Sequence, residues 1–246
     1  MFDTPDDQIG AFRRIFVRPV LKFFIRIALT LLARFEVTGK ENLPKNGPLI
    51  IVSNHFNFLD PVVLIDVLPY STEFIGGTEL PGAPALVRIF PRLYGTLRVH
   101  RGSVSREALT GGEKVLKSGG VLGIFPEAGS WAQVLRPARP GAALLAARSG
   151  AQIVPLGLEG VETIFPFRFG HRARVKIHIG QPFGPFTEDI RGRDGRERLD
   201  EIGHSLMHRI KNLLPPNKHG YYSDDPAVRQ AASGTEIYPW DNLVEK

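Results

Sequence analysis

Three short apolar runs constrain the fold of this chain more than any other feature of its sequence. They occupy residues 49–52, 121–125 and 153–156, and glycine, proline or polar residues bound each of them. Runs of this length are typical of strands that are buried on both faces of a sheet. Residues 103–117 and 142–147, which lie between the runs, have helical character. Strands that alternate with helices predict an α/β domain.

Two further elements complete the pattern toward the C-terminus. Residues 174–179 alternate between charged or histidine side chains and apolar ones, which predicts a half-exposed strand. Residues 199–213 place leucine and isoleucine side chains on one helical face, and Pro215-Pro216 ends that helix. The tail over residues 217–246 has weak periodicity, so we expect it to be extended or disordered.

The N-terminal segment over residues 11–35 is apolar but repeatedly charged. Its longest uncharged run, residues 27–33, is far shorter than the roughly 20 residues that a transmembrane helix needs. On a helical wheel, cations recur every four residues along one edge, and aromatic or aliphatic side chains lie opposite. The cations are Arg14, Arg18, Lys22 and Arg26, and the apolar side chains are Phe12, Phe16, Val20, Phe23, Ile27 and Leu31.

This pattern predicts a basic amphipathic helix. We interpret its apolar face as entering the acyl region of a membrane surface while its cations meet anionic headgroups. The alternative is an ordinary helix that packs on the domain. Because Pro19 lies inside the segment, we expect a kink or two helices, with Arg18 biased away from helical geometry.

The sequence has no feature that divides it into two folding domains. Its 246 residues are 43% hydrophobic, which is enough to bury a substantial core, and they contain no internal repeat or linker. We expect one domain over residues 36–214, a membrane-interface segment over residues 1–35 and a tail over residues 215–246. Acidic residues open the N-terminus and arginines interrupt its apolar run, unlike a signal peptide. We therefore expect a peripheral or monotopic protein on the cytoplasmic face of a membrane.

The charge and the cysteine content narrow the classes of partner and chemistry. A net charge of +6 favours an anionic partner, but scattered basic residues and the lack of a nucleic-acid module argue against nucleic acid. The absence of cysteine excludes a disulfide framework, a thiolate zinc site and a cysteine nucleophile. His204 and His208 share one helix face, but no acid or third ligand accompanies them, so we expect no metal site.

The segment whose side chains are best suited to catalysis follows the first apolar run. It reads Ser53-Asn54-His55, and Asp60 and Pro61 stand just beyond. Catalytic groups collect at strand ends in α/β folds, and Asp before Pro also marks a helix start with the carboxylate as N-cap. A turn would bring the His55 imidazole to the Asp60 carboxylate, which would make it a better base. The pair indicates deprotonation of a substrate hydroxyl, although H-x-x-x-x-D alone is a weak pattern.

Three more segments give this pattern its weight. Phe125-Pro126-Glu127 follows the second apolar run, residues 95–102 contain closely spaced cations, and Val154-Pro155 lies in the third run. In this order the segments resemble the 1-acylglycerol-3-phosphate acyltransferase family, whose blocks are NHxxxxD, a Gly-initiated segment that ends in Arg, FPEGTRS and a Val-Pro strand. The resemblance extends from about residue 35 to residue 186.

The resemblance implies a mixed, largely parallel sheet flanked by helices. It also implies transfer of an acyl group from acyl-CoA or acyl carrier protein to the hydroxyl of a lysoglycerolipid, foremost lysophosphatidic acid, without a cofactor. His55 would be the general base and Asp60 its orienting partner, and Arg101 and the Glu127 loop would shape the acceptor site. The other residues that the resemblance assigns to substrate binding are Phe125, Pro126, Gly129 and Ser130.

Two departures from the family leave the acceptor open. Ser130 replaces the arginine of the FPEGTRS block, and Gly77 stands where the family often has a lysine. Losing two charge-assisted contacts would weaken recognition of a phosphomonoester. Compensating cations could be Arg98, His100, Arg136 or Arg139. Two other functions remain as alternatives: a serine lipid hydrolase that uses Ser130, whose flanking residues only loosely imitate a nucleophile turn, and a non-catalytic membrane-binding pseudoenzyme.

Overall fold

A single mixed sheet organises the domain in the computed structural model. The structure describes residues 10–77, 85–99, 106–128, 132–168, 170–186, 190, 192 and 194–233. The strands found there are β1 (Ala33–Thr38), β2 (Leu49–Ser53), β3 (Thr72–Gly77), β4 (Leu97–Val99), β5 (Val121–Ile124), β6 (Gln152–Glu159) and β7 (Ala173–Ile179). Their order in the sheet is β1-β7-β6-β2-β5-β3-β4. The run from β6 to β4 is parallel, and β7 is antiparallel to β6 and parallel to β1, so the predicted largely parallel sheet is confirmed.

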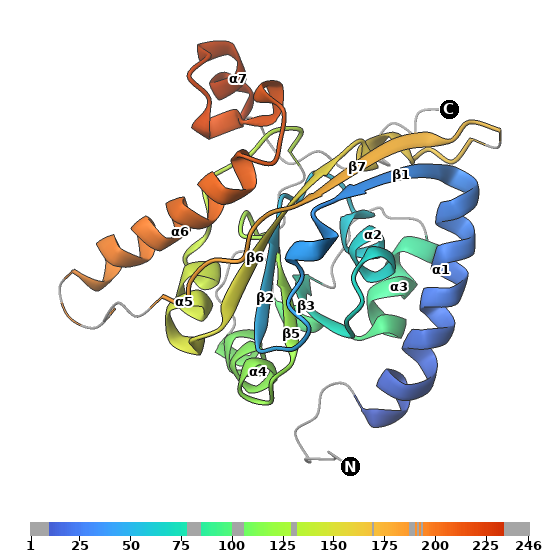
Figure 1. Cartoon of the computed structure of the whole chain (residues 1–246), viewed down its shortest axis with the longest axis horizontal. Helices are drawn as coiled ribbons and strands as arrows, with labels where there is room; N and C mark the ends of the chain where they lie inside the picture. The colour runs from blue at the N-terminus through green and yellow to red at the C-terminus, as the bar shows by residue number, and fades with distance from the viewer. Residues whose placement is uncertain are drawn as a thin grey trace.

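Helices cover both faces of this sheet. Figure 1 shows α1, α2 and α3 on one face and α4, α5 and α6 on the other, which gives a three-layer α/β domain. The α-helices are α1 (Arg18–Leu32), α2 (Asp60–Val67), α3 (Ala85–Tyr94), α4 (Arg106–Lys117), α5 (Pro140–Ser149), α6 (Gly195–Lys211) and α7 (Pro226–Ala231). Shorter turns are the π-helical η1 (Arg13–Val17) and the 3-10 helices η2 (Lys40–Asn42), η3 (Val161–Thr163), η4 (Pro216–Lys218) and η5 (Gly220–Tyr222).

The central strand β2 explains why the first apolar run is continuous. Leu49 and Ile51 pack into the core on the α2 side, whereas Ile50 and Val52 pack into the core on the α5 side. Successive side chains of a strand point to opposite faces, so a strand covered on both sides must be apolar at every position. Strand β2 is therefore a rigid support for the residues that follow it.

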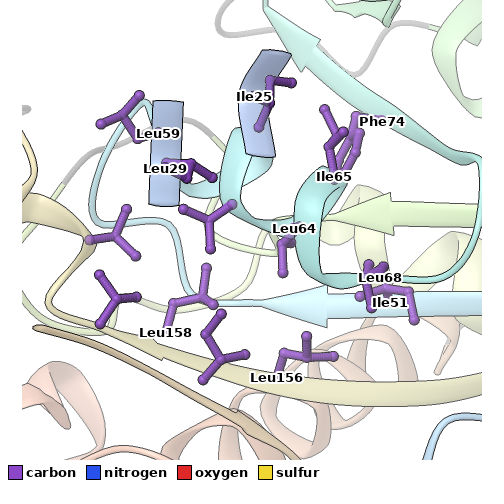
Figure 2. Close-up of a cluster of buried hydrophobic side chains, with 14 of the residues drawn as sticks. Ile25, Leu29, Ile51, Leu59, Leu64, Ile65, Leu68, Phe74, Leu156 and Leu158 are labelled. Carbon is purple, nitrogen blue, oxygen red and sulfur yellow. The ribbon is translucent and has the colours of Figure 1, made fainter. Parts of the chain in front are cut away.

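The core on the α2 side also includes the N-terminal helix. Figure 2 shows Ile25 and Leu29 of α1 close to Leu64 of α2, with Leu156 of β6 below them. All four side chains are buried, with exposed fractions of 9% or less. Helix α1 is therefore an integral part of the domain, and not a separate appendage.

The backbone of the N-terminal segment differs from the prediction in two ways. The helix ends at Leu32, and Ala33 begins β1, because pairing with β7 at the sheet edge overrides the helical pattern. Arg18 is helical, with φ −65° and ψ −43°, although it precedes proline. The π-helical turn η1 lies directly before it and changes the hydrogen-bond register where Pro19 has no N–H to donate.

The basic edge of this segment faces the domain, which contradicts the expectation that its cations meet lipid headgroups. Arg18 is only 4% exposed and donates two hydrogen bonds to the Glu73 carboxylate, at 2.8 Å from Nη1 and 2.6 Å from Nη2. Arg14 donates to the same carboxylate at 3.0 Å. A buried guanidinium needs such a partner, and β3 supplies it.

The remaining two cations of the edge bind α2. Lys22 Nζ donates to the Leu68 carbonyl at 2.6 Å, next to the C-terminus of α2, and Arg26 Nε donates to Asp66 at 2.8 Å. A cation near the C-terminal end of a helix also interacts favourably with its dipole. The periodic cations therefore fasten the helix to the domain.

Eight large apolar side chains between residues 12 and 31 point away from the domain. Each of the eight is between 44% and 70% exposed. They are Phe12, Ile15, Phe16, Val20, Phe23, Phe24, Ile27 and Leu31, here called the apolar face. Ile89 and Leu93 of the neighbouring α3 are also exposed. In the part of the chain that the structure describes, no helix combines the length and the apolar content that a bilayer crossing requires.

The C-terminal tail is folded as far as residue 233, which contradicts the expected extended or disordered state; residues 234–246 lie outside the described residues. The Leu135 N–H donates to the Lys218 carbonyl at 3.0 Å, and the Tyr221 N–H donates to the Leu135 carbonyl at 2.9 Å. Gly220 has φ +51°, and a Cβ there would lie 2.1 Å from the Leu135 carbonyl oxygen. Consecutive turns rich in proline and glycine lack a repeat, so periodicity does not reveal them.

Candidate active site

The candidate site begins where β2 ends. Asn54 is fully buried, and its side chain donates to the Leu158 carbonyl at 2.9 Å and accepts from the Leu158 N–H at 2.8 Å. This pair of bonds continues the pairing of β2 with β6 through a side chain. The main chain can therefore leave the sheet at this point while His55 stays fixed just beyond the C-terminal end of β2.

The turn after β2 brings His55 and Asp60 together, as predicted. The His55 Nδ1 atom lies 3.0 Å from Asp60 Oδ2, and the same oxygen accepts from the Asn57 N–H at 2.7 Å. Asn57 closes the turn by accepting the Leu59 N–H at 3.1 Å. Asp60 is the first residue of α2 but does not cap it, which contradicts the N-cap interpretation, because its carboxylate bonds the turn and the imidazole instead.

Burial governs the electrostatics of this pair. Asp60 is fully buried, and its Oδ1 has no hydrogen-bond partner among the described residues. Burial raises the pKa of the Asp60 carboxyl, while the hydrogen bond and charge of His55 lower it. A carboxylate that accepts from Nδ1 leaves Nε2 as the basic nitrogen of a neutral imidazole. The His55 side chain is 12% exposed, so an edge of the ring reaches the surface.

The Phe125 ring stacks against the imidazole of His55. Its ring centroid lies 4.2 Å from that of His55, with the two planes inclined by 20°. Phe74 of β3 in turn stacks on Phe125, with 6.2 Å between the two ring centroids. The structure thus brings Phe125, a predicted substrate-binding residue, into direct contact with the predicted base.

Glu127 binds two main-chain N–H groups of the site. It is 1% exposed, and it accepts the His55 N–H at 3.0 Å through Oε1 and the Arg136 N–H at 2.9 Å through Oε2. Burial raises the pKa of this carboxyl to about 8, and the two N–H groups oppose the shift. Glu127 was expected to shape the acceptor site. Both of its oxygens contact the backbone, which gives it a positioning role toward His55.

Two further residues of the loop after β5, Pro126 and Ala128, have described backbone features. The Pro126 carbonyl accepts the Arg139 N–H at 2.8 Å, which ties the start of the loop to the start of α5. Ala128 has φ +55°, a left-handed conformation that favours glycine. The predicted site residues Arg101, Gly129 and Ser130 lie outside the described residues, as does His100.

Sequence reasoning missed several charged and polar residues near the dyad. Asn54 and Asn57 stand inside the H-x-x-x-x-D segment, so their proximity to the dyad was a signal for a positioning role. Lys218 and Glu162 are distant in sequence, yet their side chains form an ion pair at 2.9 Å beside Phe56. No local pattern could have associated those two with the site.

The histidine pair on α6 belongs to a different cluster. His204 Nδ1 lies 3.2 Å from the Tyr222 hydroxyl, and the His208 ring centroid lies 5.0 Å from that of Tyr222. Burial lowers the pKa of His208. Throughout the described ranges, no group of three or more His, Cys, Asp or Glu side chains is arranged to hold a metal ion.

Known proteins share sequence with this chain. The Acyltransferase family model matches residues 34–159. A 1-acyl-sn-glycerol-3-phosphate acyltransferase of Borreliella burgdorferi is 29% identical over 169 residues, which cover 65% of this chain and 66% of that protein. A chloroplastic 1-acyl-sn-glycerol-3-phosphate acyltransferase of Brassica napus is 30% identical over 197 residues, which cover 77% of this chain and 57% of that protein. The match thus spans between about half and two thirds of these curated relatives.

A solved structure shares the fold. The 1-acyl-sn-glycerophosphate (LPA) acyltransferase PlsC of Thermotoga maritima superposes with a TM-score of 0.56, covering 81% of this chain and 80% of that chain at 23% identity. The segment matched by the family model runs from β1 to the last residue of β6, and it contains His55, Asp60 and Glu127. This chain therefore belongs to the acyltransferase family that includes the 1-acylglycerol-3-phosphate acyltransferases.

Proposed function

We propose that this protein moves a fatty acyl group from acyl-CoA or acyl carrier protein to a hydroxyl of a lysoglycerolipid. Lysophosphatidic acid is the first candidate acceptor, with phosphatidic acid as the product. The observation that carries the proposal is the pair formed by His55 Nδ1 and Asp60 Oδ2 at 3.0 Å, at the end of a buried strand. Membership of the family supports the reaction class.

In the proposed mechanism, His55 acts as a general base and then as a general acid. Its Nε2 takes the proton of the acceptor hydroxyl while the oxygen attacks the thioester carbonyl. The tetrahedral intermediate collapses, the carbon–sulfur bond breaks, and the thiolate takes the proton back from the imidazolium. The products are an ester and a free thiol. Asp60 stabilises the imidazolium and keeps the proton on Nδ1, as the carboxylate does in other His-carboxylate pairs.

We also propose that the apolar face docks on a membrane, at its cytoplasmic side. Eight large apolar side chains on one helical surface exceed what scattered exposed residues produce, and they suit the boundary between headgroups and acyl chains. Because the cations of the same segment bind the domain, insertion would be driven by apolar burial. Both the donor and the acceptor carry acyl chains, so a site at the membrane surface would meet them there.

The test of the acyl transfer is an assay of free thiol. Purified protein in liposomes should release CoA from acyl-CoA only when a lysolipid is present, and His55→Ala or Asp60→Asn should lower kcat by about 10² to 10⁴. His178→Ala, which alters an imidazole of β7 that hydrogen-bonds Thr38 of β1, is the matched control and should keep wild-type activity. Equal thiol release from His55→Ala and wild type would disprove the role of the dyad.

The same assay separates the two alternatives. A serine hydrolase would consume the thioester or a lipid ester without an acceptor, and a fluorophosphonate probe would label Ser130. A pseudoenzyme would bind liposomes and release no thiol with any acceptor or donor. A panel of lysophosphatidic acid, lysophosphatidylcholine, monoacylglycerol and glycolipids, each tried with acyl-CoA and acyl carrier protein, would identify both substrates.

A further inference from the structure

A lysine from the C-terminal tail lies beside the catalytic segment. The Lys218 Nζ atom is 5.3 Å from the ring centroid of Phe56, the residue that directly follows His55. It donates to Glu162 Oε1 at 2.9 Å, and the Lys218 side chain is 16% exposed. The Lys218 side chain is thus largely enclosed but keeps some contact with solvent.

The backbone around Lys218 is fixed to the loop that positions His55. Leu135 bonds this segment twice, to the Lys218 carbonyl and to the Tyr221 N–H. The next residue, Arg136, donates its N–H to Glu127, which in turn accepts the His55 N–H. A continuous series of hydrogen bonds therefore connects the tail to the base, and such preorganisation reduces the entropy lost on binding a ligand.

Glu162 gives the lysine its partner and its electrostatic setting. It lies in η3, directly after β6, close enough to Asp60 that its charge raises the pKa of that carboxyl. An unpaired carboxylate there would repel an anionic substrate. The ion pair cancels that repulsion, and an ammonium group has three donors, of which Glu162 uses one in the described structure.

The chemistry of the site calls for a cation of this kind. Ser130 and Gly77 leave the catalytic blocks without two cations, whereas the proposed donor and acceptor both carry phosphate. Lysine binds phosphate as a point charge on a flexible stem, so it can exchange a carboxylate partner for a phosphate oxygen.

We propose that Lys218 binds a phosphate group of a substrate, and that Glu162 occupies its ammonium group until that phosphate takes the place of the carboxylate. The inference rests on the proposed acyl transfer. The phosphate belongs either to the acceptor headgroup or to the donor, and kinetics with each substrate varied in turn distinguish the two sources. Lys218 is then a specificity-determining residue that the C-terminal tail contributes to the site.

The first arm of the test is the effect of Lys218→Ala and Lys218→Gln on KM. Both variants should raise the KM of lysophosphatidic acid about tenfold, with kcat within about twofold, if the phosphate is that of the acceptor. The KM of monoacylglycerol should stay unchanged. If the phosphate is that of the donor, the KM of acyl-CoA should rise with either acceptor. Lys176→Ala, which breaks the Lys176–Glu159 ion pair between β7 and β6, is the matched control.

The second arm tests Glu162, whose replacement should change the KM in the opposite direction to replacement of Lys218. Glu162→Gln frees the ammonium group and should lower the KM of the phosphate-bearing substrate, whereas Lys218→Arg should keep it near the wild-type value. If the ion pair were purely structural, Glu162→Gln and Lys218→Gln would change that KM in the same direction. The proposal is overturned if Glu162→Gln raises that KM as Lys218→Gln does, or if Lys218→Gln changes no KM.

A binding experiment separates failure of this inference from failure of the proposed function. Glycerol 3-phosphate, if the phosphate is that of the acceptor, or CoA, if it is that of the donor, should raise the Tm of the wild type and of His55→Ala more than that of Lys218→Gln, and glycerol should change none of them. This result with no thiol release would reject acyl transfer and keep the phosphate site. Equal shifts in all three proteins with both glycerol 3-phosphate and CoA would reject the phosphate site whatever the activity.

Discussion

Two buried carboxylates hold His55 from different directions. Asp60 bonds the ring through Nδ1, and Glu127 bonds the backbone N–H, so neither the orientation of the imidazole nor the position of its Cα depends on a single contact. Phe125 adds a stacked ring that limits rotation of the imidazole. A base that must take a proton from a bound hydroxyl benefits from such restriction, because its geometry is set before the substrate arrives.

The buried Glu127 makes the stability of the protein depend on pH. Its pKa is raised by burial from an ordinary value of 4.5 to about 8. Between these values the folded state binds a proton that the unfolded state has released, so the free energy of unfolding falls as the pH rises through that window. Asp60, whose pKa is also raised by burial, acts in the same direction.

We expect Glu127→Gln to weaken this dependence. The amide cannot ionise, so the decline in Tm between pH 5 and pH 8 should be smaller than in the wild type. At pH 5, where Glu127 is protonated in the folded wild type, the variant should have a free energy of unfolding about 1 to 3 kcal/mol lower, because one of the two N–H groups at His55 and Arg136 loses its acceptor. Thermal unfolding at several pH values measures both effects. Parallel curves for the two proteins would show that Glu127 does not titrate in this range.

At the scale of the element, the N-terminal helix has a basic edge and an apolar face whose orientations are now defined. A helical wheel correctly separates the two surfaces, but it does not indicate which of them meets the domain. Arg18 decides the orientation through its bonds to Glu73, a residue of a strand that no local pattern had indicated. The physical reason is that a buried guanidinium needs a carboxylate partner, and this partner lies 55 residues away in the sequence, beyond the reach of a local pattern.

The apolar face should be needed for membrane binding and not for folding. Replacing Phe16, Phe23 and Phe24 by serine removes large side chains that are 59% to 62% exposed, so we expect loss of flotation with liposomes but little change in Tm. A matched control replaces the exposed charged residues Arg196, Glu197 and Glu201 of α6 by serine, which should leave flotation intact. Flotation of the triple phenylalanine variant at the wild-type level would rule out this face as the docking surface.

Across the whole molecule, local contacts were predictable and distant ones were not. His55 and Asp60 are five residues apart, and the apolar strand and the Asp-Pro pair that flank their turn are visible in the sequence. Strand β1 was missed because its first residues, Ala33 to Phe35, were assigned to the amphipathic helical segment over residues 11–35. Lys218 was placed in a tail without periodicity, and only the bonds to Leu135 bring it to the site.

The Arg18–Glu73 ion pair joins α1 to β3. It is buried on both sides, and Arg18 also donates to the carbonyls of Tyr94 and Gly95 at the end of α3. Phe74 follows Glu73 and stacks on Phe125, so the residue that anchors α1 adjoins an aromatic residue of the candidate site.

Breaking this pair should destabilise the whole domain. Glu73→Ala leaves a buried guanidinium without its carboxylate, which typically costs about 3 to 5 kcal/mol. Urea unfolding would measure the loss. Replacing both residues, with Arg18→Met and Glu73→Leu, removes the uncompensated charge and should recover most of the stability. If the double variant is as unstable as Glu73→Ala, the loss comes from packing in β3 and not from an unpaired charge, and the pair then does not anchor the helix electrostatically.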